Sequence, residues 1–301
     1  GLGELRTVGE VSVAPGSESP SAQHLRAQFD DGIDLLRSEL GSDVFRAGYT
    51  LFGSLRWRLT KPVDRDYHVR VRLTDLWGRQ VTTNETAPSA AGFPTSAWPA
   101  GDQIAGRLIL PLPADLKGGR YQVEISLVDE STDCALPVRH WYGEREWLSL
   151  GTIRVEAWPL VTALPDDVEQ RLDGVEIAEN ASLRGYDLVR EDERLEITLY
   201  WQAQGSLERD YHVFVHLGKP DQPPVADAGG VPVDWTRPTT SWREGEVITD
   251  KHVISLSNVP PDRYQVLVGF YDPETGERPR TIVDGDVIRN GYVALEKVTL
   301  E

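Results

Sequence analysis

Apolar and polar residues alternate along several short stretches of this 301-residue chain. In the stretch 66–75, Tyr67, Val69, Val71 and Leu73 share one side, and polar or charged residues share the other. This period of two is typical of a half-buried antiparallel strand. Similar stretches, separated by Pro and Gly clusters, lie at 50–60, 104–112, 120–129, 150–158 and 195–203. No stretch carries a convincing helical period, so the pattern predicts an all-β sandwich.

One domain-sized pattern occurs twice in the chain. The segment RDYHV begins at Arg65 and again at Arg209, 144 positions later. Trp98 and Trp242 keep the same offset. A repeat of this length predicts an internal duplication that gives two similar domains in tandem.

A tyrosine in each repeat narrows the type of sandwich. Tyr121 and Tyr264 each follow a turn rich in Gly or Pro, and each opens a long alternating strand. This is similar to the tyrosine corner of immunoglobulin-like sandwiches, in which the hydroxyl group bonds back to the preceding loop. We therefore expect two tandem immunoglobulin-like, Greek-key β-sandwiches, with a jelly-roll sandwich as the alternative.

The predicted domain boundaries follow the repeat and the loop-forming residues. Residues 1–28 are rich in Gly, Ser, Pro and Ala and are expected to form an extended leader. The first sandwich is expected at 29–158, a short linker with two prolines at 159–172, and the second sandwich at 173–301.

The charge of the chain limits its partners. With 48 acidic and 31 basic residues, the net charge is −17. That charge argues against nucleic acid and against anionic lipid as partners, because both require a basic surface. A cationic ligand, a divalent metal or a neutral ligand is compatible with it.

Catalytic and cofactor signatures are absent from the sequence. No Ser–His–Asp, phosphate-loop or zinc motif is present. The single cysteine, Cys134, can form no internal disulfide. We expect no enzyme activity in this chain and no cofactor. A glycoside-processing enzyme is the third alternative, because two carboxyl groups would suffice for it.

No metal site is expected either. His212 and His216 would share one face of a strand at about 13 Å, which is too far apart to chelate one ion. Acidic residues between 166 and 176 could suit calcium, but they lack the spacing of a calcium loop. A solvated acidic linker is the simpler interpretation.

The repeat also separates structural residues from candidate ligand-binding residues. Residues present in both copies should serve the fold, so the shared tryptophans are expected to be buried: Trp57, Trp98, Trp201 and Trp242. Aromatic residues found in one copy are the candidates for ligand binding. They are Trp77, Trp141, Tyr142, Trp147 and Trp235.

Three of these candidates lie in the segment RHWYGEREW, residues 139–147. Aromatic faces on sandwich loops suit sugar rings, so one hypothesis places a carbohydrate site there. An apolar plug that closes the first sandwich is the alternative interpretation, and a contact with a protein partner is a third.

The second repeat resembles a known group of domains. The segments PTTSWREGE (238–246) and GFYDPETGE (269–277) carry the resemblance most specifically, together with LEITLYWQA and DYHVFVHL. They are similar to the β-sandwich domains at the C-terminal, extracytoplasmic end of bacterial multi-span membrane proteins related to protein-mannosyltransferase-type glycosyltransferases. The first repeat departs further from this pattern, with SLVDEST at 126–132.

This resemblance implies a location more than an activity. It implies an extracytoplasmic domain with a membrane-embedded domain upstream in the same chain, and catalysis would belong to that membrane part. We expect a non-catalytic module that recognises or positions a glycan, a lipid-linked sugar or a partner. A free secreted carbohydrate-binding module is the alternative. The sequence lacks methionine even at position 1, which suggests a processed product or a fragment.

The reading frame upstream of Gly1 tests this expectation. If the resemblance holds, the parent gene encodes several apolar runs of about 20 residues before this segment, each long enough to span a bilayer. Intact mass of the native protein would confirm that the product contains them. A single cleavable signal sequence would contradict the membrane-anchored arrangement and favour the free secreted module.

Overall fold

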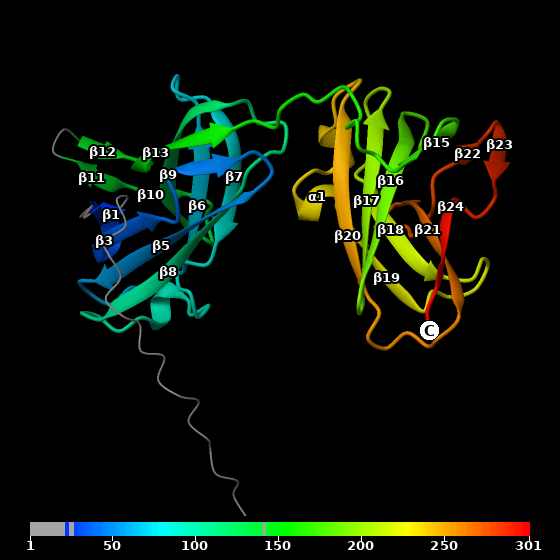
Figure 1. Cartoon of the computed structure of the whole chain (residues 1–301). Helices are drawn as coiled ribbons and strands as arrows, with labels where there is room; N and C mark the ends of the chain where they lie inside the picture. Colours follow the sequence, from blue (N-terminus) through cyan, green and yellow to red (C-terminus); the bar gives the residue numbers. More distant parts are fainter. Residues whose placement is uncertain (1–21, 24–26, 141–142) are drawn as a thin grey trace, which may run out of the picture. The chain divides into compact units, whose positions relative to one another are not determined.

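The computed structural model describes residues 22–23, 27–140 and 143–301 (Figure 1). The chain divides into two compact units. The first comprises residues up to 45, 50–111 and 120–154, and the second comprises 46–49, 112–119 and 155–301. Each unit is built almost entirely of β-strands, which confirms the predicted all-β sandwich class. The predicted leader, 1–28, lies mostly outside the described residues.

The first unit consists of two antiparallel sheets. One sheet has the order β12-β11-β2-β3-β5-β8, with β1 paired to β3, and the other has the order β4-β13-β9-β6-β7, with β10 paired to β9. The strands are β1 (Ala22–Gln23), β2 (Ala27–Phe29), β3 (Ile33–Leu40), β4 (Val44–Arg46), β5 (Thr50–Leu59), β6 (Tyr67–Thr74), β7 (Gln80–Thr86), β8 (Gln103–Pro111), β9 (Gly119–Asp129), β10 (Ala135–Leu136), β11 (Val138–His140), β12 (Gly143–Arg145) and β13 (Leu148–Glu156).

The second unit has the same layout. Its sheets have the orders β20-β17-β16-β15-β22-β23, with β14 paired to β16, and β19-β18-β21-β24. The strands are β14 (Gln170–Arg171), β15 (Val175–Ile177), β16 (Ala181–Glu191), β17 (Arg194–Ala203), β18 (His212–Gly218), β19 (Ala226–Gly230), β20 (Val247–Ser255), β21 (Arg263–Tyr271), β22 (Thr281–Val283), β23 (Asp286–Ile288) and β24 (Val293–Thr299).

The strand order is that of a Greek-key sandwich. In the first unit, β3, β5 and β8 lie side by side in one sheet, and β13, β9, β6 and β7 lie side by side in the other. Between the long strands β5 and β9, the chain changes sheets after β5, after β7 and after β8. This is the immunoglobulin-like arrangement. The second unit repeats it with β16, β17 and β20 against β24, β21, β18 and β19 (Figure 1).

Tryptophan fills the centre of each sandwich. Trp57 on β5 and Trp201 on β17 are fully buried. The ring of Trp201 lies 4.7 Å from that of Phe270 on the facing sheet, between centroids. Trp98 and Trp242 are also buried, so the expectation that the shared tryptophans serve the fold is confirmed.

In each unit, a buried threonine holds the loop that precedes β8 or β20. The Thr95 hydroxyl accepts a hydrogen bond from the Tyr67 backbone N–H (3.0 Å) and donates one to the Arg65 carbonyl (2.7 Å). In the second unit, Thr239 contacts the Tyr211 N–H (2.9 Å) and the Arg209 carbonyl in the same way. Each hydroxyl thus satisfies two backbone groups at the start of the RDYHV strand.

An arginine and an aspartate extend this contact to the facing turn. Arg65 pairs with Asp129 at 3.3 Å, and Arg209 pairs with Asp272 at 2.8 Å. The backbone N–H of Glu274 and the Arg209 guanidinium both lower the pKa of Asp272. The repeated residues therefore join the β6 and β18 strand starts to the ends of β9 and β21.

The segment 139–147 differs from the loop that the sequence suggested. Residues 138–140 and 143–145 form β11 and β12, a hairpin at the edge of the first sheet. The last residues of the predicted linker, Gln170 and Arg171, form β14 and pair with β16.

The second tyrosine corner supplies a stability test. The Tyr264 hydroxyl donates to the Pro260 carbonyl at 2.9 Å, and its ring is buried. Tyr264→Phe should lower the free energy of unfolding by about 1 kcal/mol, because one buried hydrogen bond is lost without a cavity. Tyr49→Phe, at a side chain that is 45% exposed, is the matched control. Equal denaturant midpoints for the two variants would show that the corner contributes nothing.

Candidate functional site

The two units differ most on the outer face of the smaller sheet. In the first unit, ion pairs cover this face: Arg70 contacts Glu85 at 2.7 Å and Asp133 at 2.6 Å. Arg72 contacts Glu124 at 2.8 Å. Each of these partners, Glu85 and Glu124, lies directly opposite its arginine on a neighbouring strand.

The second unit replaces these ion pairs with rings and small residues. Phe214 and His216 stand on β18 at the positions of Arg70 and Arg72. Gly229 lies opposite Phe214, and Leu267 lies opposite His216. A Cβ at Gly229 would lie 2.2 Å from the Val213 carbonyl oxygen, and the φ angle there is +151°, so the position favours glycine.

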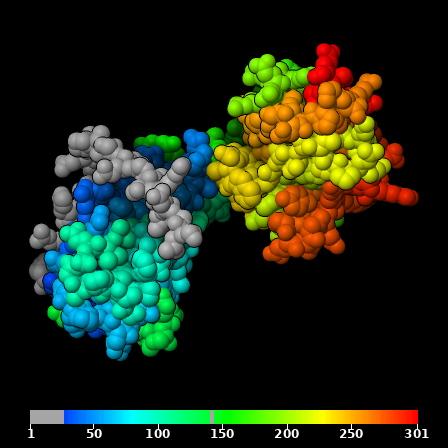
Figure 2. Space-filling view, turned by 90° about the horizontal axis from the view of Figure 1, so that it is seen from below, coloured from blue at the N-terminus to red at the C-terminus, as the bar shows by residue number. Residues whose placement is uncertain are grey.

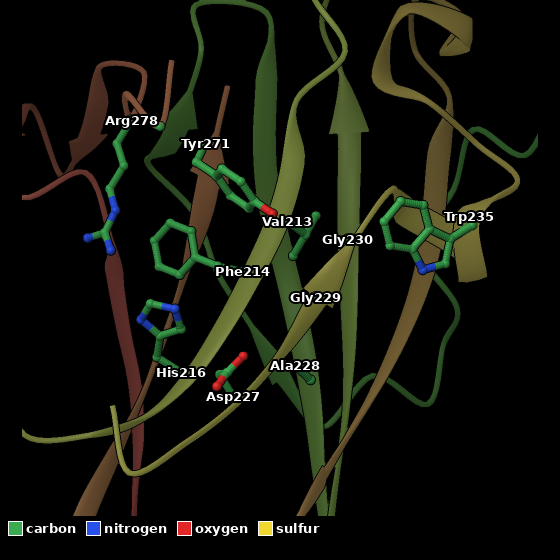
Figure 3. A pocket seen from close by; sticks show the side chains of 11 residues that line it. Val213, Phe214, His216, Asp227, Ala228, Gly229, Gly230, Trp235, Tyr271 and Arg278 are labelled. Atoms are coloured by element: carbon green, nitrogen blue, oxygen red, sulfur yellow. The ribbon is translucent and has the colours of Figure 1, made fainter. Parts of the chain in front are cut away.

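These replacements open a cavity of about 380 Å³ (Figure 3). Strand β18 supplies Phe214 and His216, β19 supplies Asp227 and the glycines that follow it, and β21 supplies Tyr271. Trp235 and Arg278 complete the wall. A second cavity of about 350 Å³ shares Phe214, His216 and Arg278 with the first and adds Asp221, Asn290 and Tyr292. Segments around residues 210–240, coloured yellow, form part of the exposed surface of this unit (Figure 2).

Trp235 forms one side of the cavity. Its side chain is 62% exposed. A Cβ at Gly230 would lie 2.7 Å from the indole ring, so the absence of a side chain there lets the ring lie against the strand. The His212 ring meets the indole edge-on, with centroids 5.3 Å apart, and its Nδ1 lies 3.2 Å from the Tyr271 hydroxyl. The exposed indole is therefore held by ring and hydroxyl contacts.

Arg278 forms the opposite side. Its guanidinium lies over the Phe214 ring at 4.2 Å from the centroid, and the His216 ring lies 4.7 Å from that of Phe214 (Figure 3). Partial burial lowers the pKa of Arg278. Burial also lowers the pKa of His216, and the charge of Arg278 adds to this effect, whereas Asp227 opposes it. Burial and the charge of Arg278 both favour the neutral form of the His216 ring.

A left-handed turn positions Trp235. The short element α1 (Pro232–Trp235) has positive φ angles at Val233 (56°), Asp234 (51°) and Trp235 (66°). This conformation is costly for a β-branched residue such as Val233, so the surrounding structure must maintain it. The Val233 N–H donates to the carboxylate of Asp250 at 2.7 Å.

Asp250 lies at the centre of a buried polar network. It is fully buried, and its Oδ2 accepts a hydrogen bond from Trp201 Nε1 at 3.2 Å and lies 2.7 Å from His252 Nε2. The first unit has Gly106 at this position, and Trp57 Nε1 has no hydrogen-bond partner among the described residues. Asp250 therefore links the core tryptophan to the turn that carries Trp235, and it does so in the second unit.

The structure separates the aromatic residues that the sequence predicted as ligand-binding. Trp235 lies at the cavity. Trp77 is 81% exposed at the tip of the β6–β7 hairpin in the other unit. Trp147 is half-buried, with the Arg72 guanidinium 3.8 Å from its ring centroid. Trp141 and Tyr142 lie outside the described residues.

Sequence reasoning missed the other members of the cavity. Phe214 and Arg278 were not singled out, and His216 was interpreted as part of a solvent-facing strand surface. A usable signal was present, because Arg70 and Arg72 of the first repeat change to Phe214 and His216 in the second. The exchange of Arg72 for His216 by itself indicated only a polar strand surface, because the sequence does not show that Arg278 and Trp235 meet this strand.

The described residues show no metal centre. Across residues 22–23, 27–140 and 143–301, no group of three or more His, Cys, Asp or Glu side chains is placed to hold an ion. Within the same residues, no helix has the length and apolar character that crossing a membrane requires.

Comparisons with known proteins identify no family for this chain. No protein-family model matches the sequence, and no curated protein matches it. One solved structure that it matches weakly is that of a DUF4785 family protein from Legionella pneumophila, at 12% identity and a TM-score of 0.25. The match covers 88% of this chain and 57% of that protein, so the chain spans little more than half of its length. A TM-score this low carries no argument about function.

The buried hydrogen bonds of Asp250 predict a large loss of stability when its carboxylate is removed. Asp250→Ala should lower the free energy of unfolding by about 3 kcal/mol, because Trp201 Nε1 and the Val233 N–H lose their buried acceptor. Chemical denaturation measures the loss. Asp286→Ala, at an exposed carboxylate in the same unit, should change stability by less than about 0.5 kcal/mol. Similar stabilities for the two variants would contradict the role assigned to Asp250.

Proposed function

We propose that this chain is a non-catalytic, extracytoplasmic recognition module whose second sandwich binds a glycan. The observation that carries the proposal is the cavity of the second unit, where an exposed indole and two further rings stand beside His216, Asp227 and Arg278. The corresponding face of the first unit is covered by ion pairs.

The mixture of side chains suits a sugar. The C–H faces of a sugar ring can lie on an aromatic surface, while its hydroxyl groups require donors and acceptors at the edges. Trp235 supplies the exposed aromatic surface. Asp227 supplies acceptors and Arg278 supplies donors from the opposite wall. Preformed strands hold these groups, which lowers the ordering cost of binding.

The same cavity favours binding over hydrolysis. Glycosidases use two carboxyl groups on either side of the scissile bond. Among the described residues that line the larger cavity, Asp227 is the single carboxylate. The second cavity contributes Asp221, which accepts hydrogen bonds from Asn290 and from Tyr292. This arrangement supports a module that recognises rather than cleaves its ligand.

The extracytoplasmic location and the membrane-anchored parent protein rest on the sequence resemblance. The segments that carry it, 238–246 and 269–277, contain Thr239, Trp242 and Asp272, which hold the sandwich together. A glycan-binding module beside a glycosyltransferase-like membrane part would position a glycan or a lipid-linked sugar. The free secreted carbohydrate-binding module keeps the same site without the membrane part.

Removal of the exposed indole tests glycan binding. Trp235→Ala should weaken binding of the preferred glycan by about 2 kcal/mol, or roughly thirtyfold, because truncation of an aromatic anchor removes its contact area. A glycan array on the wild type, followed by calorimetry on the best probe, measures the change.

Trp77→Ala is the matched control, because that side chain is also exposed but belongs to the other unit. It should bind the glycan as the wild type does. Loss of binding in the control and retention in Trp235→Ala would move the site to the first unit, where the sequence hypothesis placed it near Trp141 and Trp147. An array on which the wild type binds no glycan would contradict the proposed function.

A further inference from the structure

Arg278 lies against an aromatic ring of the cavity and has no carboxylate partner among the described residues. Its guanidinium lies over Phe214 at the boundary of the two cavities, and one of its N–H groups donates to the Asn290 carbonyl at 2.8 Å. No ion pair joins it to a carboxylate among the described residues, although the chain carries 17 more acidic than basic residues. A guanidinium has five N–H donors, so most of them remain for a ligand.

The two arginines at the corresponding strand positions of the first unit, Arg70 and Arg72, are both paired. Arg70 contacts Glu85 and Asp133, and Arg72 contacts Glu124. The first unit thus supplies the counter-ions of these two arginines from its own side chains. Arg278 is exposed, and no described carboxylate pairs with it, so its charge is accessible to an anionic group of a ligand.

The carboxylates nearest to Arg278 in the cavities have other partners. Asp221 is bound by the Asn290 amide and by the Tyr292 hydroxyl. Asp227 lies beside His216 and acts on the pKa of that ring. Neither carboxylate contributes to the pKa of Arg278, on which burial and Tyr292 act.

We infer that the glycan bound by the second unit is acidic, and that Arg278 recognises its carboxylate, sulfate or phosphate group. This inference rests on the proposed function, because it names the class of glycan for the same cavity. The guanidinium fork can donate two parallel hydrogen bonds to a planar or tetrahedral oxyanion. The Phe214 ring lies beneath the guanidinium, and the His216 ring beside Phe214 supplies a further polar contact.

A protein of net charge −17 can still bind a small acidic sugar. A charge of −17 disfavours anionic surfaces such as nucleic acid or lipid, which contact a large area. A small acidic sugar contacts the cavity alone. Salt screens charges that lie beyond about 8 Å. The ionic contact with Arg278, at a few ångströms, therefore outweighs the repulsion from distant acidic residues.

The test uses matched pairs of probes that differ in one acidic group. Oligogalacturonate is compared with its methyl ester, a sulfated galactan fragment with its desulfated form, and a phosphorylated mannan fragment with its dephosphorylated form. The wild type should bind the acidic member of at least one pair about tenfold more tightly or better. The pair that shows the difference identifies the acidic group.

Arg278→Gln should abolish this preference, so that the acidic and the neutral member of the pair bind with equal affinity. Arg289→Gln removes the same charge from an exposed position of the same unit and should keep the preference. Arg278→Lys should recover part of it, because the charge remains but the fork is lost. Melting temperatures of all three variants verify that they are folded.

The outcomes separate this inference from the proposed function. Equal binding of acidic and neutral members, both weakened by Trp235→Ala, would overturn the acidic class and leave the glycan site in place. An acidic preference that survives Arg278→Gln would overturn the assignment to Arg278. Absence of binding to every probe and to the glycan array would overturn both proposals.

Discussion

A buried threonine hydroxyl is the contact on which each sandwich depends. Thr95 and Thr239 are fully buried, and each bridges two backbone groups at the start of a central strand. Buried backbone groups without partners are costly, so this loop must lie where it does. The adjacent tryptophans, Trp98 and Trp242, then fill the end of the core. Arg65, Asp129 and their counterparts Arg209 and Asp272 extend this junction to the facing turn.

Because the threonine junction and the core maintain the fold, the residues on the outer face of the smaller sheet can differ between the two units. Its residues point away from the core, and their replacement leaves the strand pairing unchanged. The first unit uses this freedom for ion pairs such as Arg72–Glu124, and the second uses it for a cavity around Phe214. Asp250 adds a second difference, because it maintains a left-handed turn that the first unit does not need.

Sequence reasoning found one member of the candidate site. Trp235 was selected because the first repeat lacks it, and the structure places it at the cavity. Trp77 and Trp147 satisfied the same criterion but lie in the other unit, far along the chain from the cavity residues. Arg278 was missed because its contact with Phe214 spans 64 residues, and no local pattern predicts which strands and loops meet.

The sequence alone determined the long core strands, the sandwich class and the buried tryptophans, but not the short edge strands β11, β12 and β14. Alternation reports which side of a strand is buried, and the repeat distinguishes residues of the fold from residues of one copy. The tertiary structure decided the rest. The cavity depends on residues from β18, β19, β21 and two loops, and the turn at Val233 depends on a carboxylate 17 residues away. Such contacts are set by cross-strand register and by packing, which act between segments that are distant in the sequence.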